Sequence, residues 1–107
     1  MKAHEDAQIT SLAAHRGAFF RVLQQTAHSQ VVVMTIAAGA DGWPEEEHRG
    51  DQIVYVIEGE ALLRVGGAEH QVRGGSVVTI PARTLHHVRN PGSSPLFLLT
   101  VYAPPEY

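Results

Sequence analysis

The sequence has 107 residues, of which 44% are hydrophobic, and it carries a formal net charge of −3 at pH 7. This length predicts one domain with one core. The Lys and Arg residues are scattered, which argues against nucleic acid or an anionic membrane surface as a partner. No apolar run approaches the about 20 residues that a membrane-spanning helix needs.

The sequence contains no cysteine, which excludes disulfides and thiolate metal sites within it. Any metal ion must therefore be held by nitrogen and oxygen atoms. The opening segment, MKAHEDAQIT, includes acidic residues and lacks the apolar stretch of a secretory signal. We therefore expect a cytoplasmic protein.

Residues 1–18 are polar and alanine-rich, and a helical turn after Ser11 would end at Gly17. From Phe19 onward, short runs rich in β-branched residues alternate with turns that contain glycine or proline. The predicted strands cover residues 19–23, 30–37, 52–57, 61–65, 69–72, 76–80, 85–89 and 96–102. This pattern predicts an all-β sandwich or barrel, with residues 1–18 as a polar N-terminal segment and residues 19–107 as the single domain.

Three potential metal ligands lie at even positions of one stretch: Glu46, His48 and Gln52. We expect this stretch to be β-strand, so that all three side chains leave the same face. A carboxylate, an imidazole and an amide oxygen can each bind a transition metal. His86, on a later predicted strand, completes the set if the two strands pack side by side.

Two spaced segments resemble the two motifs of the cupin superfamily. The second cupin motif orders glycine, proline, glycine, histidine and asparagine at fixed spacing. Gly75, Pro81, His86 and Asn90 fall at that spacing, and Arg83 stands at the central glycine position. These residues identify the later half of the chain as similar to a cupin.

The first cupin motif contains a histidine pair one residue apart, then a glutamate, then a glycine. When the motif is anchored on Gly59, its two histidine positions fall on Glu46 and His48 and its glutamate position on Gln52. The resemblance covers roughly residues 19–103. By the same resemblance, phosphomannose isomerases, which are also cupins, use glutamine, histidine, glutamate and histidine, and this chain has these four types with Glu and Gln exchanged.

The resemblance implies a jelly-roll barrel, also called a double-stranded β-helix, that binds one divalent transition metal. Its four ligands would be Glu46, His48, Gln52 and His86, and one carboxylate with two imidazoles suits Zn, Mn, Fe, Ni or Co. Two residue roles stay open. Glu46 could belong to the solvated acidic run 45–47, and Gln52 could serve to hydrogen-bond a ligand histidine. The two histidines could also be interior residues without a metal.

We expect this metal to act on a small polar molecule such as a sugar or a carbonyl acid. Lewis-acid isomerase, epimerase or lyase chemistry and oxygenase chemistry both fit, with phosphomannose isomerase favouring the former. Because no dedicated general base stands out, catalysis itself stays open. The alternative is a non-catalytic module that binds a small molecule or the metal.

The resemblance also implies a homodimer, for which the apolar run 31–34 could supply a paired strand edge. The remaining histidines have other predicted positions. His87 should point away from the face of His86, and His70 should face solvent. His4, His15 and His28 are expected at the surface or at caps, and Trp43 in a loop that either packs or lines the barrel mouth.

Overall fold

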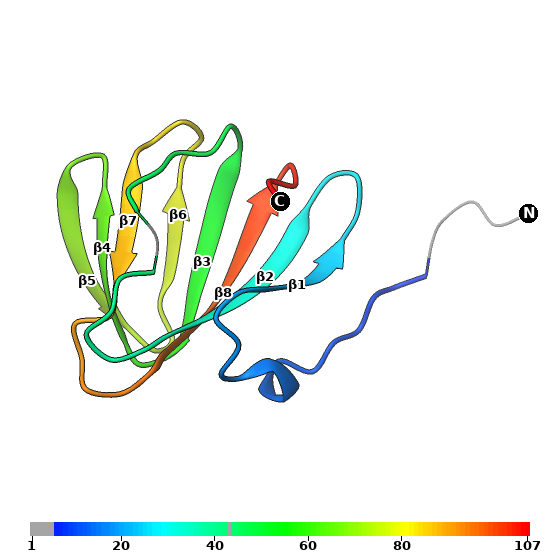
Figure 1. Ribbon diagram of the computed structural model, residues 1–107. Coiled ribbons are helices and arrows are strands. Elements are labelled where there is room, and N and C mark those ends of the chain that lie inside the picture. The colour runs from blue at the N-terminus through cyan, green and yellow to red at the C-terminus, as the bar shows by residue number, and fades with distance from the viewer. Residues whose placement is uncertain (1–5, 43) are drawn as a thin grey trace, which may run out of the picture.

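The computed structural model describes residues 6–42 and 44–107. Within them, eight strands form one five-stranded and one three-stranded antiparallel sheet, which lie on either side of the core (Figure 1). The strands are β1 (Arg21–Gln25), β2 (Gln30–Ile36), β3 (Asp51–Glu58), β4 (Glu60–Val65), β5 (Ala68–Arg73), β6 (Val77–Ile80), β7 (His86–Arg89) and β8 (Leu96–Ala103). A short 3₁₀ turn, η1 (Ala13–His15), precedes them. Each predicted strand agrees with an observed one to within two residues at either end.

The strand order is β1-β2-β8-β3-β6 in the larger sheet and β5-β4-β7 in the smaller. The chain crosses from one sheet to the other several times, as Figure 1 shows for β3 and β4. This arrangement is the predicted jelly-roll, or double-stranded β-helix, and it confirms the all-β fold class. The predicted helical turn after Ser11 is present as η1.

Alternating side chains build the core between the sheets. In β3, Gln52, Val54 and Val56 are buried while the residues between them are exposed. This alternation follows from the pleat, which points successive side chains to opposite faces. Strand β8 pairs with β3 in register, Gln52 opposite Tyr102 and Val54 opposite Thr100. The inner face of the larger sheet therefore carries Gln52 into the interior.

Left-handed backbone conformations occur at the tight turns. Gly66 and Gly67, with φ values of 58° and 89°, form the predicted hairpin turn between β4 and β5. Arg83 has a φ of 62°, a region that favours glycine, at the position where the cupin motif has one. Arg83 thus adopts the backbone conformation that glycine would favour at this position of the motif, although its side chain differs.

The stretch from Glu46 to Gln52 is not one continuous strand, so the prediction that parity alone aligns its side chains is wrong. Strand β3 begins at Asp51, and the chain before it is irregular apart from an isolated bridge at Glu46. The reason lies at Gly50, where an added Cβ would stand 2.4 Å from the carbonyl oxygen of Ala103. This close backbone approach bends the chain before it joins the sheet.

The prediction that residues 31–34 form a paired edge is also wrong. These residues belong to β2, whose two sides are occupied by β1 and β8. A strand with two neighbours has no free backbone groups to offer another chain. The edges of the larger sheet are β1 and β6.

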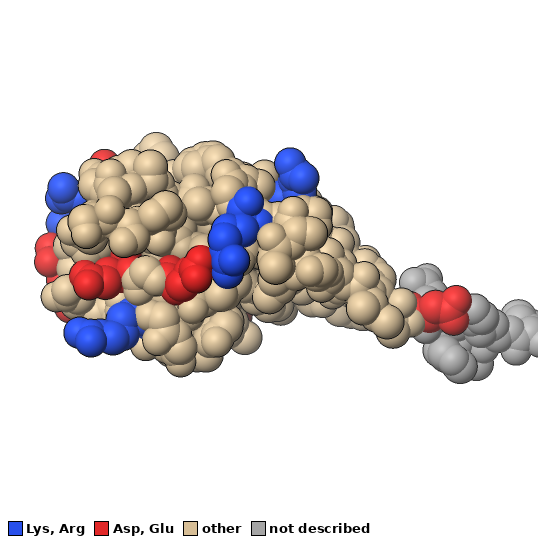
Figure 2. Space-filling view, turned by 90° about the horizontal axis from the view of Figure 1, so that it is seen from below, with Lys and Arg blue, Asp and Glu red and all other residues tan. Residues whose placement is uncertain are grey.

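Figure 2 shows basic and acidic side chains interspersed on the face of the molecule that it presents. Among the described residues, no helix is both long and apolar enough to cross a membrane. His70 is exposed, as predicted. His4 and Trp43 lie outside the described residues.

Candidate metal centre

An isolated β-bridge holds two of the predicted ligands side by side. The backbone N of Glu46 donates to the carbonyl of His86 at 3.0 Å, and the N of His86 donates back to the carbonyl of Glu46 at 2.8 Å. His86 is the first residue of β7, in the smaller sheet. The two residues are far apart in the sequence, and this reciprocal pairing sets the separation of their side chains.

His48 lies in the irregular segment between this bridge and β3. Its carbonyl accepts a 2.7 Å hydrogen bond from the N of Arg83, which ties the segment to the turn before β7. The imidazole is buried, with its centroid 4.9 Å from the His86 ring and 5.0 Å from the Tyr102 ring. Because His48 lies outside the strands, its side-chain contacts, rather than strand alternation, set its orientation.

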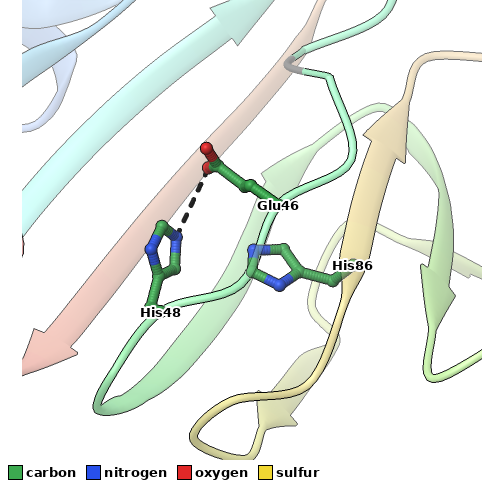
Figure 3. Close-up of side chains that lie close together, drawn as sticks. All are labelled: Glu46, His48 and His86. Carbon is green, nitrogen blue, oxygen red and sulfur yellow. Dashed lines mark ion pairs between the residues drawn. The ribbon is translucent and has the colours of Figure 1, made fainter.

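Glu46, His48 and His86 converge on one point. Their candidate donor atoms all lie within 4.8 Å of one another, and the side chains point toward a common space (Figure 3). Glu46 Oε1 and His48 Nε2 are 3.4 Å apart. Two donors of one ion at about 2.1 Å are separated by about 3.0–3.4 Å when the angle between them is octahedral or tetrahedral. The group is thus placed to hold a single metal ion.

The polar contacts of Nδ1 in the two histidines leave Nε2 of each ring available to a metal. Nδ1 of His86 lies 3.0 Å from the carbonyl oxygen of Thr84, to which it can donate. Nδ1 of His48 lies 3.1 Å from Glu106 Oε1. With a proton on Nδ1, Nε2 keeps its lone pair, which is the tautomer that binds a metal. Nε2 of His48 is buried and has no hydrogen-bond partner within residues 6–42 and 44–107.

Gln52 is buried close to this group, and its amide is oriented by two hydroxyls. Its Nε2 donates to Thr100 Oγ1 at 2.9 Å and to the Tyr102 hydroxyl at 3.3 Å. Its Oε1 is buried and, in the part of the chain that the structure describes, accepts no hydrogen bond. A buried acceptor without a donor is unfavourable by about 1–3 kcal/mol, so this oxygen is suited to a cation.

A small cavity of about 20 Å³ adjoins Glu46, Gln52 and His86. That volume admits about one water molecule. Apart from His87, the rest of its lining is apolar: Met34, Val54, Leu63, Ile80, Val88 and Leu98. On its inner side, therefore, the group faces the core, and only a very small ligand group can enter there.

The sequence interpretation missed two residues at this site, Glu106 and Tyr107. Besides the contact of Glu106 with His48, the Tyr107 hydroxyl donates to Glu46 Oε1 at 3.3 Å. Burial, followed by the negative charge of Glu46, raises the pKa of Tyr107 to about 12. Burial likewise raises the pKa of Tyr102, whose ring packs against His48. Neither residue near the chain end shows ligand spacing, so the sequence contained no signal for them.

The other histidines take no part in the group. His87 follows His86 on β7, so its side chain alternates to the outer face, where its Nε2 lies 3.6 Å from Asp41 Oδ1. His28 is exposed, and His15 is half-buried in η1. Met34 lines the cavity, and Tyr55 of β3 is 38% exposed.

Comparison with known proteins shows the family. Residues 32–102 match the cupin domain family, from Val32 of β2 to Tyr102 of β8. The chain belongs to the cupin family. Within this cupin, His48, Gln52 and His86 lie inside the matched region together with Glu46.

Individual proteins are similar to this cupin over most of its length. The protein SCO3923 of Streptomyces coelicolor is 33% identical over 97 residues, which cover 88% of this chain and 87% of that protein. YrkC of Bacillus subtilis is 31% identical over 86 residues, which cover 75% of this chain. The chain spans about half the length of YrkC, since the match covers 46% of that protein. Both are named as uncharacterized proteins. The crystal structure of BH2720 from Bacillus halodurans has a TM-score of 0.86 and 32% identity, covering 98% of this chain and 86% of that one.

Proposed function

We propose that this cupin binds one divalent transition metal ion through Glu46, His48 and His86. The observation that supports this most directly is the convergence of the three donors within 4.8 Å, in a buried setting. The polar contacts of both Nδ1 atoms, with the Thr84 carbonyl and with Glu106, add to it, because each leaves Nε2 as the donor. Zn, Mn, Fe, Ni and Co all accept a set of one carboxylate and two imidazoles.

We further propose Gln52 as the fourth ligand. Its unpartnered Oε1 and its place in the lining of the same cavity as Glu46 and His86 support this role. An amide oxygen adds no charge, so a bound divalent ion would keep about one positive unit. Such a centre polarises a carbonyl or acidifies a bound water, and with a redox-active metal it supports dioxygen chemistry.

As substrate we propose a small polar molecule that presents one oxygen atom to this centre, such as a sugar or a carbonyl acid. The inner cavity of about 20 Å³ holds no more than a water-sized group, so the rest of the substrate would lie outside this cavity. Lewis-acid isomerase, epimerase or lyase chemistry is the preferred reaction class, by the resemblance to phosphomannose isomerases, and an oxygenase is the second.

One observation favours a non-catalytic binding module instead. Glu46 belongs to the donor group and Glu106 contacts His48, so both of these carboxylates are already engaged. Isomerisation and epimerisation need a group that accepts a proton. Assays of the metal-loaded protein against a panel of sugar phosphates and carbonyl acids separate the two functions. Binding without conversion across that panel favours the module.

Metal binding is tested by elemental analysis of protein that has been purified without chelator. The parent protein should contain about one transition-metal ion per chain, and the double variant His48→Ala/His86→Ala almost none. The double variant His28→Ala/His70→Ala removes two exposed histidines and is the matched control, so it should retain the metal. Equal and low metal content in all three proteins would contradict the proposal.

We also propose that this cupin forms a homodimer through the outer face of its larger sheet. Ile53 and Tyr55 of β3 and Val77 of β6 are 39%, 38% and 63% exposed on that face, and Tyr55 lies opposite Val77. Exposed apolar side chains that adjoin one another are typical of interaction surfaces. Light scattering should give a dimer for the parent and for Gln71→Asp, a control on the other sheet, and a monomer for Ile53→Asp. A monomeric parent would contradict this assembly.

A further inference from the structure

The segment after β8 folds back over the candidate metal centre, and Gln30 holds it there. Gln30 is fully buried, and its Oε1 accepts hydrogen bonds from the backbone N atoms of Glu106 at 3.2 Å and Tyr107 at 3.0 Å. Its Nε2 donates to the carbonyl of Tyr107 at 2.6 Å and to Gln25 Oε1 at 3.0 Å. One buried side chain thus fixes the backbone of both residues.

This anchoring places a carboxylate directly behind His48. Glu106 Oε1 lies 3.1 Å from His48 Nδ1, while Glu46 Oε1 lies 3.4 Å from Nε2 on the other side of the ring. The His48 side chain is 6% exposed and that of Glu106 24%. In such a sheltered place a charge-assisted hydrogen bond is stronger than one to a neutral acceptor.

The two histidines of the centre differ in how they are held. His86 sits on β7, is fixed by its bridge to Glu46, and can donate Nδ1–H to the carbonyl oxygen of Thr84. His48 lies outside the strands, and its backbone carbonyl bonds to Arg83, which leaves the ring orientation to side-chain contacts. The Glu106 carboxylate contacts the Nδ1 side of this ring, at 3.1 Å.

We propose that Glu106 is a positioning residue of the metal centre. Its carboxylate accepts a hydrogen bond from Nδ1–H of His48, fixes the orientation of the ring and keeps Nε2 as the donor atom. This inference rests on the metal-binding function proposed above. Partners of this kind change metal affinity by about 10–100-fold in known sites. Tyr107, which donates to Glu46 Oε1 at 3.3 Å, extends the same segment to a second ligand.

The affinity test is a Zn²⁺ titration of the full chain against a competing chelator. Glu106→Ala should raise the Kd about 10–100-fold. Glu106→Gln keeps an amide oxygen that can accept a hydrogen bond from Nδ1–H of His48, so it should recover part of that loss. The control Glu69→Ala removes an exposed carboxylate paired with Arg64 on β4 and should leave the Kd unchanged. A Kd for Glu106→Ala within twofold of the parent would overturn the proposal.

A second measurement does not depend on the metal. Nitrogen-15 NMR of the His48 ring in the metal-free protein should show Nδ1 protonated in the parent and in Glu106→Gln. In Glu106→Ala, the proton should shift toward Nε2, which a purely structural role of Glu106 would not cause. A parent ring protonated on Nε2 alone would overturn the inference. If the parent shows the expected tautomer but binds no Zn²⁺, the proposed function fails while the hydrogen bond from His48 to Glu106 stands.

Discussion

Glu46 and His86 pair through two reciprocal backbone hydrogen bonds of 3.0 Å and 2.8 Å, which form an isolated β-bridge at the start of β7. This bridge brings a carboxylate from the segment before β3 beside an imidazole from β7. Because of this bridge, Glu46 is the residue of the acidic run 45–47 that faces the histidines. Its neighbours Glu45 and Glu47 are exposed.

Glu46→Gln should therefore weaken metal binding by about tenfold or more, because it removes the anionic member of the proposed ligand set. Glu45→Gln removes the same charge one residue away from an exposed position and should leave affinity close to that of the parent. Isothermal titration with Zn²⁺ measures both. If the two variants lose affinity equally, the overall charge matters and the placement of Glu46 does not.

Gln52→Glu tests whether the amide oxygen is a ligand. A carboxylate at this position would add a second negative charge to the ligand set, and we expect metal binding to tighten by about tenfold. The hydroxyls of Thr100 and Tyr102 can rotate to donate to the new oxygen in place of accepting from Nε2. Competition titration with Mn²⁺ gives the change. Unchanged or weaker metal binding would indicate that Gln52 makes hydrogen bonds within the protein and is not a metal ligand.

Asn90→Ala should lower the free energy of unfolding by about 3 kcal/mol. Asn90 is fully buried, and its Nδ2 donates to the carbonyls of Ile36 and Ser94 at 2.9 Å and 2.7 Å. Its Oδ1 accepts from the N of Gly92 at 2.9 Å. Truncation leaves these backbone groups without their partner. Urea denaturation measures the loss, and a change below about 0.5 kcal/mol would be incompatible with this account.

Gly59→Ala should destabilise the turn between β3 and β4 more than Gly67→Ala destabilises the hairpin between β4 and β5. Both glycines have positive φ, 98° and 89°, so each alanine is strained by about 1–2 kcal/mol. At Gly59 the new Cβ would also lie 2.7 Å from the carbonyl oxygen of Pro95, whereas at Gly67 nothing lies within 4 Å. We expect a further loss of about 1–3 kcal/mol at Gly59. Equal midpoints in urea would show that the backbone relaxes freely there.

The sequence determined the strands and their inward faces. Alternation of apolar and polar residues, as in β3, is a local property that the pleat converts directly into a buried and an exposed face. The turns at Gly66 and Gly67 are equally local, because their backbone conformation favours glycine whatever surrounds it. The candidate ligands were also named from the sequence, through the spacing of the two motifs.

The tertiary structure decided how those ligands meet. Glu46, His48 and Gln52 do not share one strand, because the chain bends at Gly50 against Ala103, a contact between distant segments. The bridge from Glu46 to His86 and the carboxylate of Glu106 behind His48 depend on the same long-range packing. Spacing along the chain cannot encode contacts of this kind. They arise only when the two sheets close and the segment after β8 docks on Gln30.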